Sequence, residues 1–465
     1  MVFSSLKFSF IFMPIFFALY YIMPKKMKDI ILIFGSLSFY YVGTIGHFEH
    51  FIVFICSILM DYIVGILIEK YQKKKKVFLV MGVVTHIICF SIFKYYGFVA
   101  GELQGIFKNF KPALDIVLPV GISFYTFQGI SYIADVYKGK VKAEKNLLRF
   151  GVYIAMFEQL IAGPILTYNQ VKRELYRRKL SLSMVLKGIG HFIFGLGLKV
   201  LLANPLGKLW NDVTAIGYES ISTPLAWMAI IAFSFQIYFD FWGYSLMAIG
   251  LGKMLGFNLP KNFDFPYLSR SMSEFWRRWH ITLGSWFREY VYIPLGGNRD
   301  GKIAVVRNLM FVWILTGLWH GAGYNYLAWG FILFILITIE KLLIGKVLNK
   351  VPVIGHIYML LCIPLTWMIF AIDNLWNIRV FFTRLFPFFG QGVWGEFRED
   401  YLKYIGTYWP FFILGLILCM RWPFKLFDRL KEKKIALIIV LLLIFVASTY
   451  CLYIGLDDPF MYFIF

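Results

Sequence analysis

The stretch that decides the fold is NLMFVWILTGLWHGAGYNYLAWGFILFILITI, residues 308–339. It belongs to two apolar runs, near 304–319 and 324–340, which approach the roughly 20 residues that a helix needs to cross ~30 Å of hydrocarbon. Between the runs lies a short tip, Trp319-His320-Gly321, that places an ionisable side chain beside small residues. This stretch therefore predicts a hairpin of two membrane spans with a histidine at its tip.

Similar apolar runs recur along the whole chain. Hydrophobic residues make up 60% of the sequence and charged residues only 16%, whereas about a quarter is charged in soluble domains. The predicted spans lie near 8–23, 30–47, 49–68, 77–96, 114–134, 182–202, 224–252, 304–319, 324–340, 352–372, 408–420 and 435–456. We therefore expect an all-α polytopic membrane protein with about eleven or more transmembrane helices, forming one membrane domain over residues 1–465.

The net charge of +21 is distributed in short basic segments between the apolar runs. These segments are Lys25–Lys28, Lys73–Lys76, Lys138–Arg149, Lys172–Lys179, Lys253–Arg307, Lys341–Lys350 and Arg421–Lys434. Short basic loops stay in the cytoplasm because anionic lipids and the membrane potential disfavour their transfer. The charge thus predicts topology and a membrane lipid partner, not nucleic acid, and it leaves both termini and the polar stretch 373–403 outside the cytoplasm.

Two segments depart from a simple pattern of spans and loops. Residues 150–165 are apolar but short, contain Gly163-Pro164 and have basic clusters on both sides, so we expect a re-entrant segment. Residues 274–287 are expected to form one amphipathic helix. One face of it carries Trp276, Trp279, His280, Leu283, Trp286 and Phe287, and the other carries Glu274, Arg277, Arg278 and Arg288.

The sequence holds 7 histidines but no pattern typical of a metal site. It also has no phosphate-binding loop and no GxSxG elbow, so an ATP-driven pump and an α/β-hydrolase are not expected. We expect interface or packing roles for His47, His50, His86, His191 and His356, and packing roles for the 5 cysteines. His320 is different, because an ionisable group within a membrane is a functional candidate and imidazole suits proton transfer near neutral pH. A hydrogen bond between helices is its structural alternative.

Several segments together resemble the membrane-bound O-acyltransferase (MBOAT) family. They are Leu118–Phe124, Ala162–Ile165, Phe239–Ser245, Ala248–Gly250, Asn262-Phe263, Arg278–Leu283, Leu318–Gly321 and Pro459–Phe463. The run Tyr292–Arg299, with the N-terminal Met1–Ser5, resembles the bacterial branch that O-acetylates alginate and peptidoglycan. Trp242 and Leu246 depart from that branch, which often has serine and aspartate there.

The resemblance implies a fold in which bent helices and re-entrant segments enclose a tunnel. It implies catalytic roles for His320 and His280, with His320 where cytoplasmic and external cavities meet. Acetyl-CoA is the expected acyl donor, and no bound cofactor is expected. The expected residues for binding the donor or substrate are Trp319, Arg277, Arg278, Arg288, Arg299, Tyr244 and Ser245.

The acceptor is expected to be a cell-surface polysaccharide, or a partner acetyltransferase with an SGNH-hydrolase-like domain outside the bacterial cell membrane. Residues 381–404, including Trp394, are the expected docking stretch. One alternative is a D-alanyl transferase of teichoic acid, whose partner would be an acyl-carrier protein. Two alternatives from other classes are a secondary transporter, which should show an internal repeat, and a structural subunit of an export complex.

Overall fold

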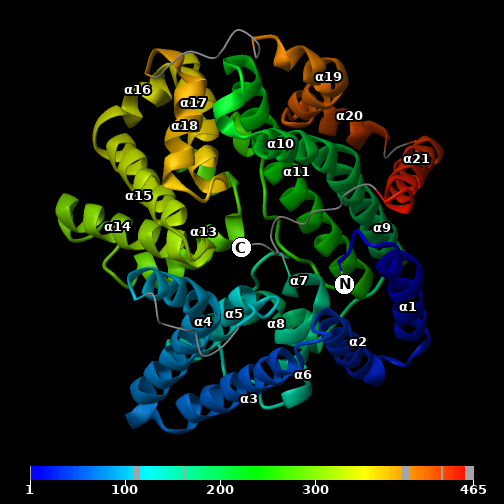
Figure 1. Cartoon of the computed structure of the whole chain (residues 1–465). Coiled ribbons are helices and arrows are strands. Elements are labelled where there is room, and N and C mark those ends of the chain that lie inside the picture. The colour runs from blue at the N-terminus through cyan, green and yellow to red at the C-terminus, as the bar shows by residue number, and fades with distance from the viewer. Residues whose placement is uncertain (1, 108–115, 162, 390–397, 431–432, 456–465) are drawn as a thin grey trace. The chain divides into compact units, whose positions relative to one another are not determined.

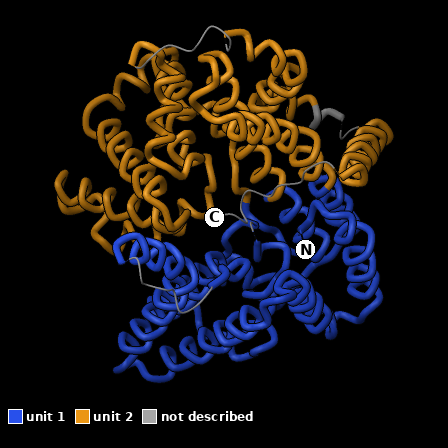
Figure 2. Tube along the Cα trace, in the orientation of Figure 1, with its two compact units in different colours: residues 1–192, 245–260 blue, residues 193–244, 261–465 orange. Residues whose placement is uncertain are grey.

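Helices and their connections account for all of the described chain. The computed structural model describes residues 2–107, 116–161, 163–389, 398–430 and 433–455, and these residues contain no strand. The chain divides into two compact units, residues 1–192 with 245–260 and residues 193–244 with 261–465 (Figure 2). The single membrane domain over residues 1–465 stays a prediction, because a division into two compact units does not show whether they are separate domains.

Unit 1 contains the N-terminal helices of the chain (Figure 1). They are α1 (Met13–Ile22), α2 (Lys28–Gly43), α3 (Phe48–Lys70), α4 (Lys75–Ile106), α5 (Ile122–Tyr137), α6 (Leu147–Ala155), α7 (Phe157–Leu160) and α8 (Tyr168–Tyr176). Two long helices, α9 (Leu182–Gly197) and α11 (Thr223–Leu255), contribute residues to both units.

Unit 2 contains α10 and the helices that follow α11 (Figure 1). They are α10 (Asn204–Ile216), α12 (Met272–Arg278), α13 (Ile281–Phe287), α14 (Gly301–His320), α15 (Tyr324–Ile339), α16 (Gly345–Lys350), α17 (Pro352–Ala371), α18 (Leu375–Leu385), α19 (Asp400–Leu418), α20 (Trp422–Leu430) and α21 (Lys434–Tyr453).

In the described chain, 9 helices are long and apolar enough to cross a membrane, and Phe8–Ile22 is a shorter apolar helix. The all-α polytopic prediction is thereby confirmed. Two predicted spans are shorter than expected, since α2 and α5 have 16 residues each. The predicted span 114–134 has wrong bounds: its residues 114–115 lie outside the described chain, and α5 begins only at Ile122, after Gly121 with a φ of 75°.

Close helix packing depends on glycine at several crossings. A Cβ on Gly317 of α14 would lie 2.5 Å from the Tyr326 carbonyl oxygen of α15, and one on Gly330 would lie 2.5 Å from that of Trp313. Only residues without side chains allow such an approach of two backbones. The hairpin predicted from residues 308–339 is therefore a tightly packed helix pair with His320 at the end of its first helix.

The segment predicted to be re-entrant folds as two short helices. α6 has 9 residues and α7 has 4, so neither can cross ~30 Å of hydrocarbon. The break falls at Met156, and the amide of Phe157 after it donates a hydrogen bond to Ser36 Oγ at 3.2 Å. The residues around the break are fully buried. This geometry agrees with a re-entrant path, although its side of the membrane stays a prediction.

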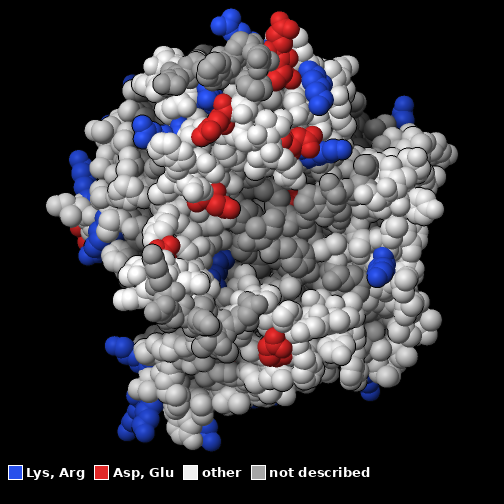
Figure 3. All heavy atoms as spheres, viewed as in Figure 1, with Lys and Arg blue, Asp and Glu red and all other residues white. Residues whose placement is uncertain are grey.

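Charged side chains are sparse on the face that Figure 3 displays, and most of the visible described surface is uncharged. The exposed residues of the chain include many large apolar side chains, such as Ile22, Leu360 and Leu443. Exposed apolar surface on this scale is expected of helices that face lipid. In the predicted docking stretch, residues 381–385 belong to α18, and Trp394 lies outside the described residues, as does the family segment Pro459–Phe463.

Candidate active site around His280 and His320

The predicted helix 274–287 is wrong, because the chain breaks at Trp279 and His280. α12 ends at Arg278, α13 begins at Ile281, and His280 between them has a φ of 44°. Such a left-handed conformation is uncommon outside glycine and is found where the surrounding structure holds it in place. The helical periodicity of the aromatic residues was real, but it did not reveal the break.

The loop after α11 stabilises this break through its backbone. The amide of Ile281 donates to the Asn262 carbonyl at 2.9 Å, and the amide of Asp264 donates to the Arg278 carbonyl at 3.0 Å. Backbone groups that a continuous helix would satisfy internally are thus paired across two segments. The chain here turns sharply without leaving these groups unpaired.

Glu340, at the end of α15, anchors the start of α12. Its carboxylate accepts hydrogen bonds from the amide of Met272 at 2.5 Å, the amide of Ser273 at 2.8 Å and the Ser273 hydroxyl at 2.7 Å. An acidic group at a helix N-terminus pairs with free amides and with the helix dipole. Since α15 also packs on α14, this buried carboxylate connects the segment of His280 to the hairpin of His320.

Asn262 holds the His280 side chain. Asn262 Oδ1 lies 3.1 Å from His280 Nδ1, 2.9 Å from the Thr282 hydroxyl and 3.3 Å from the Thr282 amide. A backbone amide can only donate, so the Asn262 atom at this point must be its oxygen. His280 Nδ1 therefore carries a proton that it donates to Asn262, and in the neutral ring Nε2 carries the lone pair.

His320 is held in the same tautomer by a different group. Its Nδ1 lies 2.8 Å from the carbonyl oxygen of Thr316, one turn earlier in α14, and a carbonyl oxygen can only accept. The ring is buried against Trp319, Trp329 and Phe370, with ring centroids 4.7 to 5.4 Å away. In its neutral form, His320 thus presents the basic Nε2 within an aromatic environment.

The two histidines belong to one site. The rings of His280 and Trp319 meet edge to face at a centroid distance of 6.2 Å, and Trp319 precedes His320 directly. Burial, and secondarily the electrostatic effect of His320, lower the pKa of His280 well below its usual range. His280 is therefore neutral at physiological pH. The structure brings together three predicted residues, His280, Trp319 and His320.

The four arginines predicted to attract the donor differ in their surroundings. Arg277, Arg288 and Arg299 are exposed, whereas Arg278 is half-buried and forms an ion pair with Glu274 at 2.5 Å. Three of these side chains are therefore accessible to a polyanionic donor in the described structure. Arg278 already has a carboxylate partner.

Tyr244 and Ser245 are both buried in α11. One contact of α11 with His280 comes from Phe241, one turn earlier, at a centroid distance of 4.7 Å. Asp240, one residue earlier still, forms a buried ion pair with Lys199 at 2.8 Å. Sequence reasoning gave this pair and Phe370 no role, and it named Asn262 and Thr282 only within family segments, because their contacts depend on the tertiary structure.

A further cluster of His47, Glu49 and His50 has ligand atoms within 4.8 Å of one another. The His47–Glu49 contact, at 3.0 Å, is a hydrogen bond within an exposed turn. The expectation of no metal site stays a prediction.

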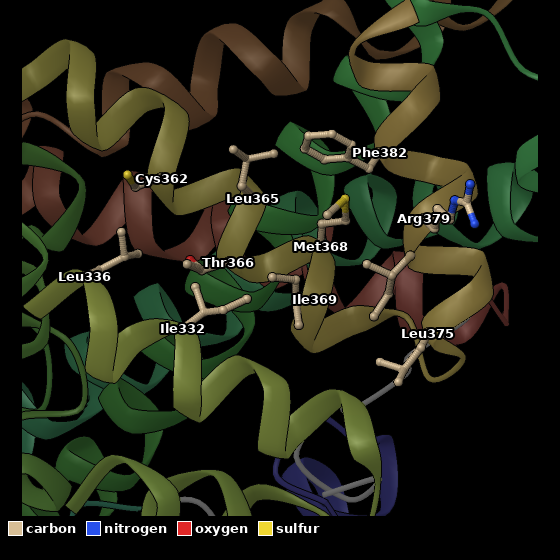
Figure 4. A pocket seen from close by; sticks show the side chains of 11 residues that line it. Ile332, Leu336, Cys362, Leu365, Thr366, Met368, Ile369, Leu375, Arg379 and Phe382 are labelled. Atoms are coloured by element: carbon tan, nitrogen blue, oxygen red, sulfur yellow. The ribbon is translucent and has the colours of Figure 1, made fainter. Parts of the chain in front are cut away.

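An open apolar groove of about 430 Å³ lies between α15, α17 and α18 (Figure 4). Its lining includes Leu336, Cys362, Phe382 and one cation, Arg379. None of the residues that line it is a predicted catalytic or donor-binding residue, although Phe382 belongs to the predicted docking stretch 381–404. The groove therefore does not mark the position of the two histidines.

Comparison with known proteins agrees with this site. Residues 144–349, which contain both histidines, match the model of the membrane-bound O-acyltransferase family. The chain is 36% identical to a Pseudomonas aeruginosa protein named "probable alginate O-acetylase", over 85% of this chain and 76% of that protein. It is 32% identical to the peptidoglycan O-acetyltransferase of Helicobacter pylori, over 73% of this chain and 70% of the relative.

A more distant relative is the teichoic acid D-alanyltransferase of Bacillus subtilis, which is 27% identical over 49% of this chain and 60% of that protein. The matches to the alginate and peptidoglycan enzymes thus cover more of both chains than the match to the D-alanyltransferase, as the resemblance predicted. The chain belongs to the membrane-bound O-acyltransferase family, in its alginate and peptidoglycan O-acetylation branch, and is a multi-pass membrane O-acyltransferase.

Proposed function

We propose that this protein transfers an acetyl group from cytosolic acetyl-CoA to a hydroxyl of a cell-surface polysaccharide, directly or through an extracytoplasmic partner with an SGNH-hydrolase-like domain. The observation that carries the proposal is the buried His320, whose Nδ1 donates to Thr316 and whose Nε2 is left basic. The likeness to alginate and peptidoglycan O-acetylating proteins supports the acetyl group and the kind of acceptor.

His320 acts as the general base in this proposal. Its Nε2 takes the proton of the acceptor hydroxyl while the hydroxyl oxygen bonds to the thioester carbonyl carbon. The carbon–sulfur bond then breaks, and the proton passes to the departing thiolate. The products are an acetyl ester and the free thiol of coenzyme A.

His280 has a different role from His320 in this proposal. An imidazolium would be a good donor to the developing oxyanion, but the neutral ring donates through Nδ1 to Asn262. Its Nε2 is consequently an acceptor, suited to orient the acceptor hydroxyl or an N–H of the donor. Hydrogen bonds to the oxyanion must come from another group.

The donor is proposed to arrive from the cytoplasm. Arg277, Arg288 and Arg299 are accessible to its phosphates, and guanidinium groups suit such ligands. The D-alanyl alternative would use the same basic residues to bind an acidic acyl-carrier protein. The lower coverage of the D-alanyltransferase match makes it the second choice.

The central test is transfer by the purified protein in lipid nanodiscs, with isotope-labelled acetyl-CoA and an acceptor polysaccharide. We expect labelled ester and one free thiol per acetyl group, and neither with His320→Asn. If acetyl-CoA is not consumed but a D-alanylated carrier protein supports transfer, the donor assignment is wrong and the alternative is correct.

We also propose that the protein lies in the bacterial cell (cytoplasmic) membrane with both termini outside the cytoplasm. Cysteines introduced at Lys145 and Lys172, in a variant without the 5 native cysteines, should then resist an impermeant external thiol reagent. Both positions flank the segment 147–165. Labelling of either cysteine in intact cells would contradict the re-entrant path and change the orientation of every later helix.

A further inference from the structure

Asn262 lies beside His280 and uses only one end of its amide for structure. The side chain is 1% exposed, and its Oδ1 accepts all three hydrogen bonds described above, from His280 and Thr282. Its Nδ2 is fully buried and has no hydrogen-bond partner among the described residues. A buried N–H without a partner loses its hydrogen bonds to water and gains none in return, so a group that stays unpaired in this position requires an explanation.

The three acceptor contacts fix how this amide is oriented. Oδ1 accepts hydrogen bonds from the Thr282 amide, the Thr282 hydroxyl and the His280 ring. If the amide were flipped, Nδ2 would face the Thr282 N–H, and two donors cannot form a hydrogen bond. Nδ2 is bonded to the same carbon as Oδ1, which places it about 2.3 Å from that oxygen. The unpaired donor is therefore held rigidly at the edge of His280, not free to rotate toward another partner.

We propose that Asn262 serves the transfer reaction with both ends of its amide: Oδ1 keeps His280 in the Nδ1–H tautomer, and Nδ2 donates a hydrogen bond to the carbonyl oxygen of the acyl group. This inference rests on the proposed acyl transfer. The carbonyl oxygen gains negative charge when the hydroxyl adds to the thioester, and a rigid N–H donor stabilises that charge. The neutral His280 ring cannot supply this bond from Nδ1, which makes Asn262 the complementary group.

Asn262→Asp separates these functions from simple packing. Aspartate has nearly the same shape and keeps the oxygen that accepts from His280 and Thr282, but it replaces the Nδ2 donor with a charged oxygen. We expect kcat to fall at least about tenfold, since loss of one oxyanion donor typically costs 100- to 1,000-fold. The new carboxylate should also raise the pKa of His280, because a nearby negative charge favours the protonated ring, and this alters the pH profile of kcat.

The control is Asn308→Asp, which also introduces a carboxylate at a fully buried asparagine of the same unit. Asn308 Nδ2 donates to the backbone carbonyl of Gly297 at 3.0 Å. This variant should lose stability while the shape of its pH profile stays that of the wild type. If Asn262→Asp does not fold, Asn262→Ser, which is neutral and lacks the amide N–H, takes its place, and a wild-type kcat in Asn262→Ser would overturn the proposal.

Titration of His280 by NMR of ring-labelled histidine distinguishes failure of the proposed acyl transfer from failure of the role inferred for Asn262. An inactive wild type would remove the proposed function, yet a raised His280 pKa in Asn262→Asp would still support the role of Oδ1. An active wild type whose kcat, pH profile and His280 titration are all unchanged by Asn262→Asp would overturn the inference about Asn262 alone.

Discussion

Two buried histidine environments in this protein differ in the polar group that contacts the imidazole ring. In unit 1, His86 of α4 contacts the Asp61 carboxylate of α3 at 2.7 Å, and both side chains are almost fully buried. In unit 2, His280 and His320 donate through Nδ1 to an amide oxygen and a backbone carbonyl oxygen, and no carboxylate takes part in those contacts. One environment pairs the ring with an acid, and the other pairs it with neutral acceptors.

The difference lies in how each ring is held. A carboxylate orients the ring of His86 through its Nε2, whereas neutral acceptors at Nδ1 fix the tautomer of His280 and His320 and leave Nε2 as the basic nitrogen. The His86–Asp61 pair also lies against Gly129 of α5, where any Cβ would collide with both side chains. It thus connects three helices, which agrees with the predicted packing role of His86.

The largest expected effect is the loss of acyl-transfer activity in the His320→Asn variant. The asparagine amide can still donate to the Thr316 carbonyl, but it removes the basic Nε2. We expect turnover to fall roughly 100- to 10,000-fold with little change in thermal stability. Near-normal turnover of the folded variant in detergent would show that His320 is not the general base.

The converse change is Asp61→Asn, which gives His86 a neutral partner. Removing one member of a buried ion pair typically destabilises a protein by roughly 3–5 kcal/mol. We expect a clearly lower unfolding temperature, and the same direction of change for Gly129→Ala, with turnover per folded molecule unchanged. Loss of specific activity without loss of stability would assign His86 to the reaction and erase the contrast between the two regions.

A smaller effect on turnover is expected from His280→Asn, which retains a donor to Asn262 but loses Nε2. Because this nitrogen orients a substrate and does not take the proton, we expect a fall of roughly 10- to 100-fold. Turnover per folded molecule and KM should be measured together with His320→Asn. Equal losses in the two variants would mean that the histidines share the base function.

The smallest expected effect is on the pH dependence of stability. The pKa of folded His280 is below the value of about 6.5 expected for the unfolded chain, so the unfolded state binds more protons in acid. This contribution to stability is complete above pH ~6.5 and declines as the pH falls, by at most about 1.4 kcal/mol per pH unit. The free energy of unfolding of His280→Asn should depend less on pH in this range than that of the wild type, and an equal dependence would contradict the prediction.

The sequence itself predicted the membrane fold and, for a physical reason, singled out His320 as a functional candidate, whereas the role of His280 was implied only by the family resemblance. These signals are local properties of the chain: long apolar runs, their basic boundaries, and the tripeptide Trp319-His320-Gly321. The length of an apolar run can be compared directly with the thickness of the hydrocarbon, and basic boundaries indicate the cytoplasmic side. The short helices α6 and α7 also agree with the Gly-Pro signal and the basic flanks of their segment. Periodicity was less informative in 274–287, where it predicted one helix.

Only the tertiary structure decided what the histidines contact. The break at His280 depends on backbone hydrogen bonds from residues 262–264, and its tautomer depends on Asn262, 18 residues away. Likewise, Asp61 and His86 are 25 residues apart, and nothing in either apolar run predicts their contact. Burial makes each such partner decisive, because in a low-dielectric interior the nearest polar group determines the tautomer and orientation of an imidazole.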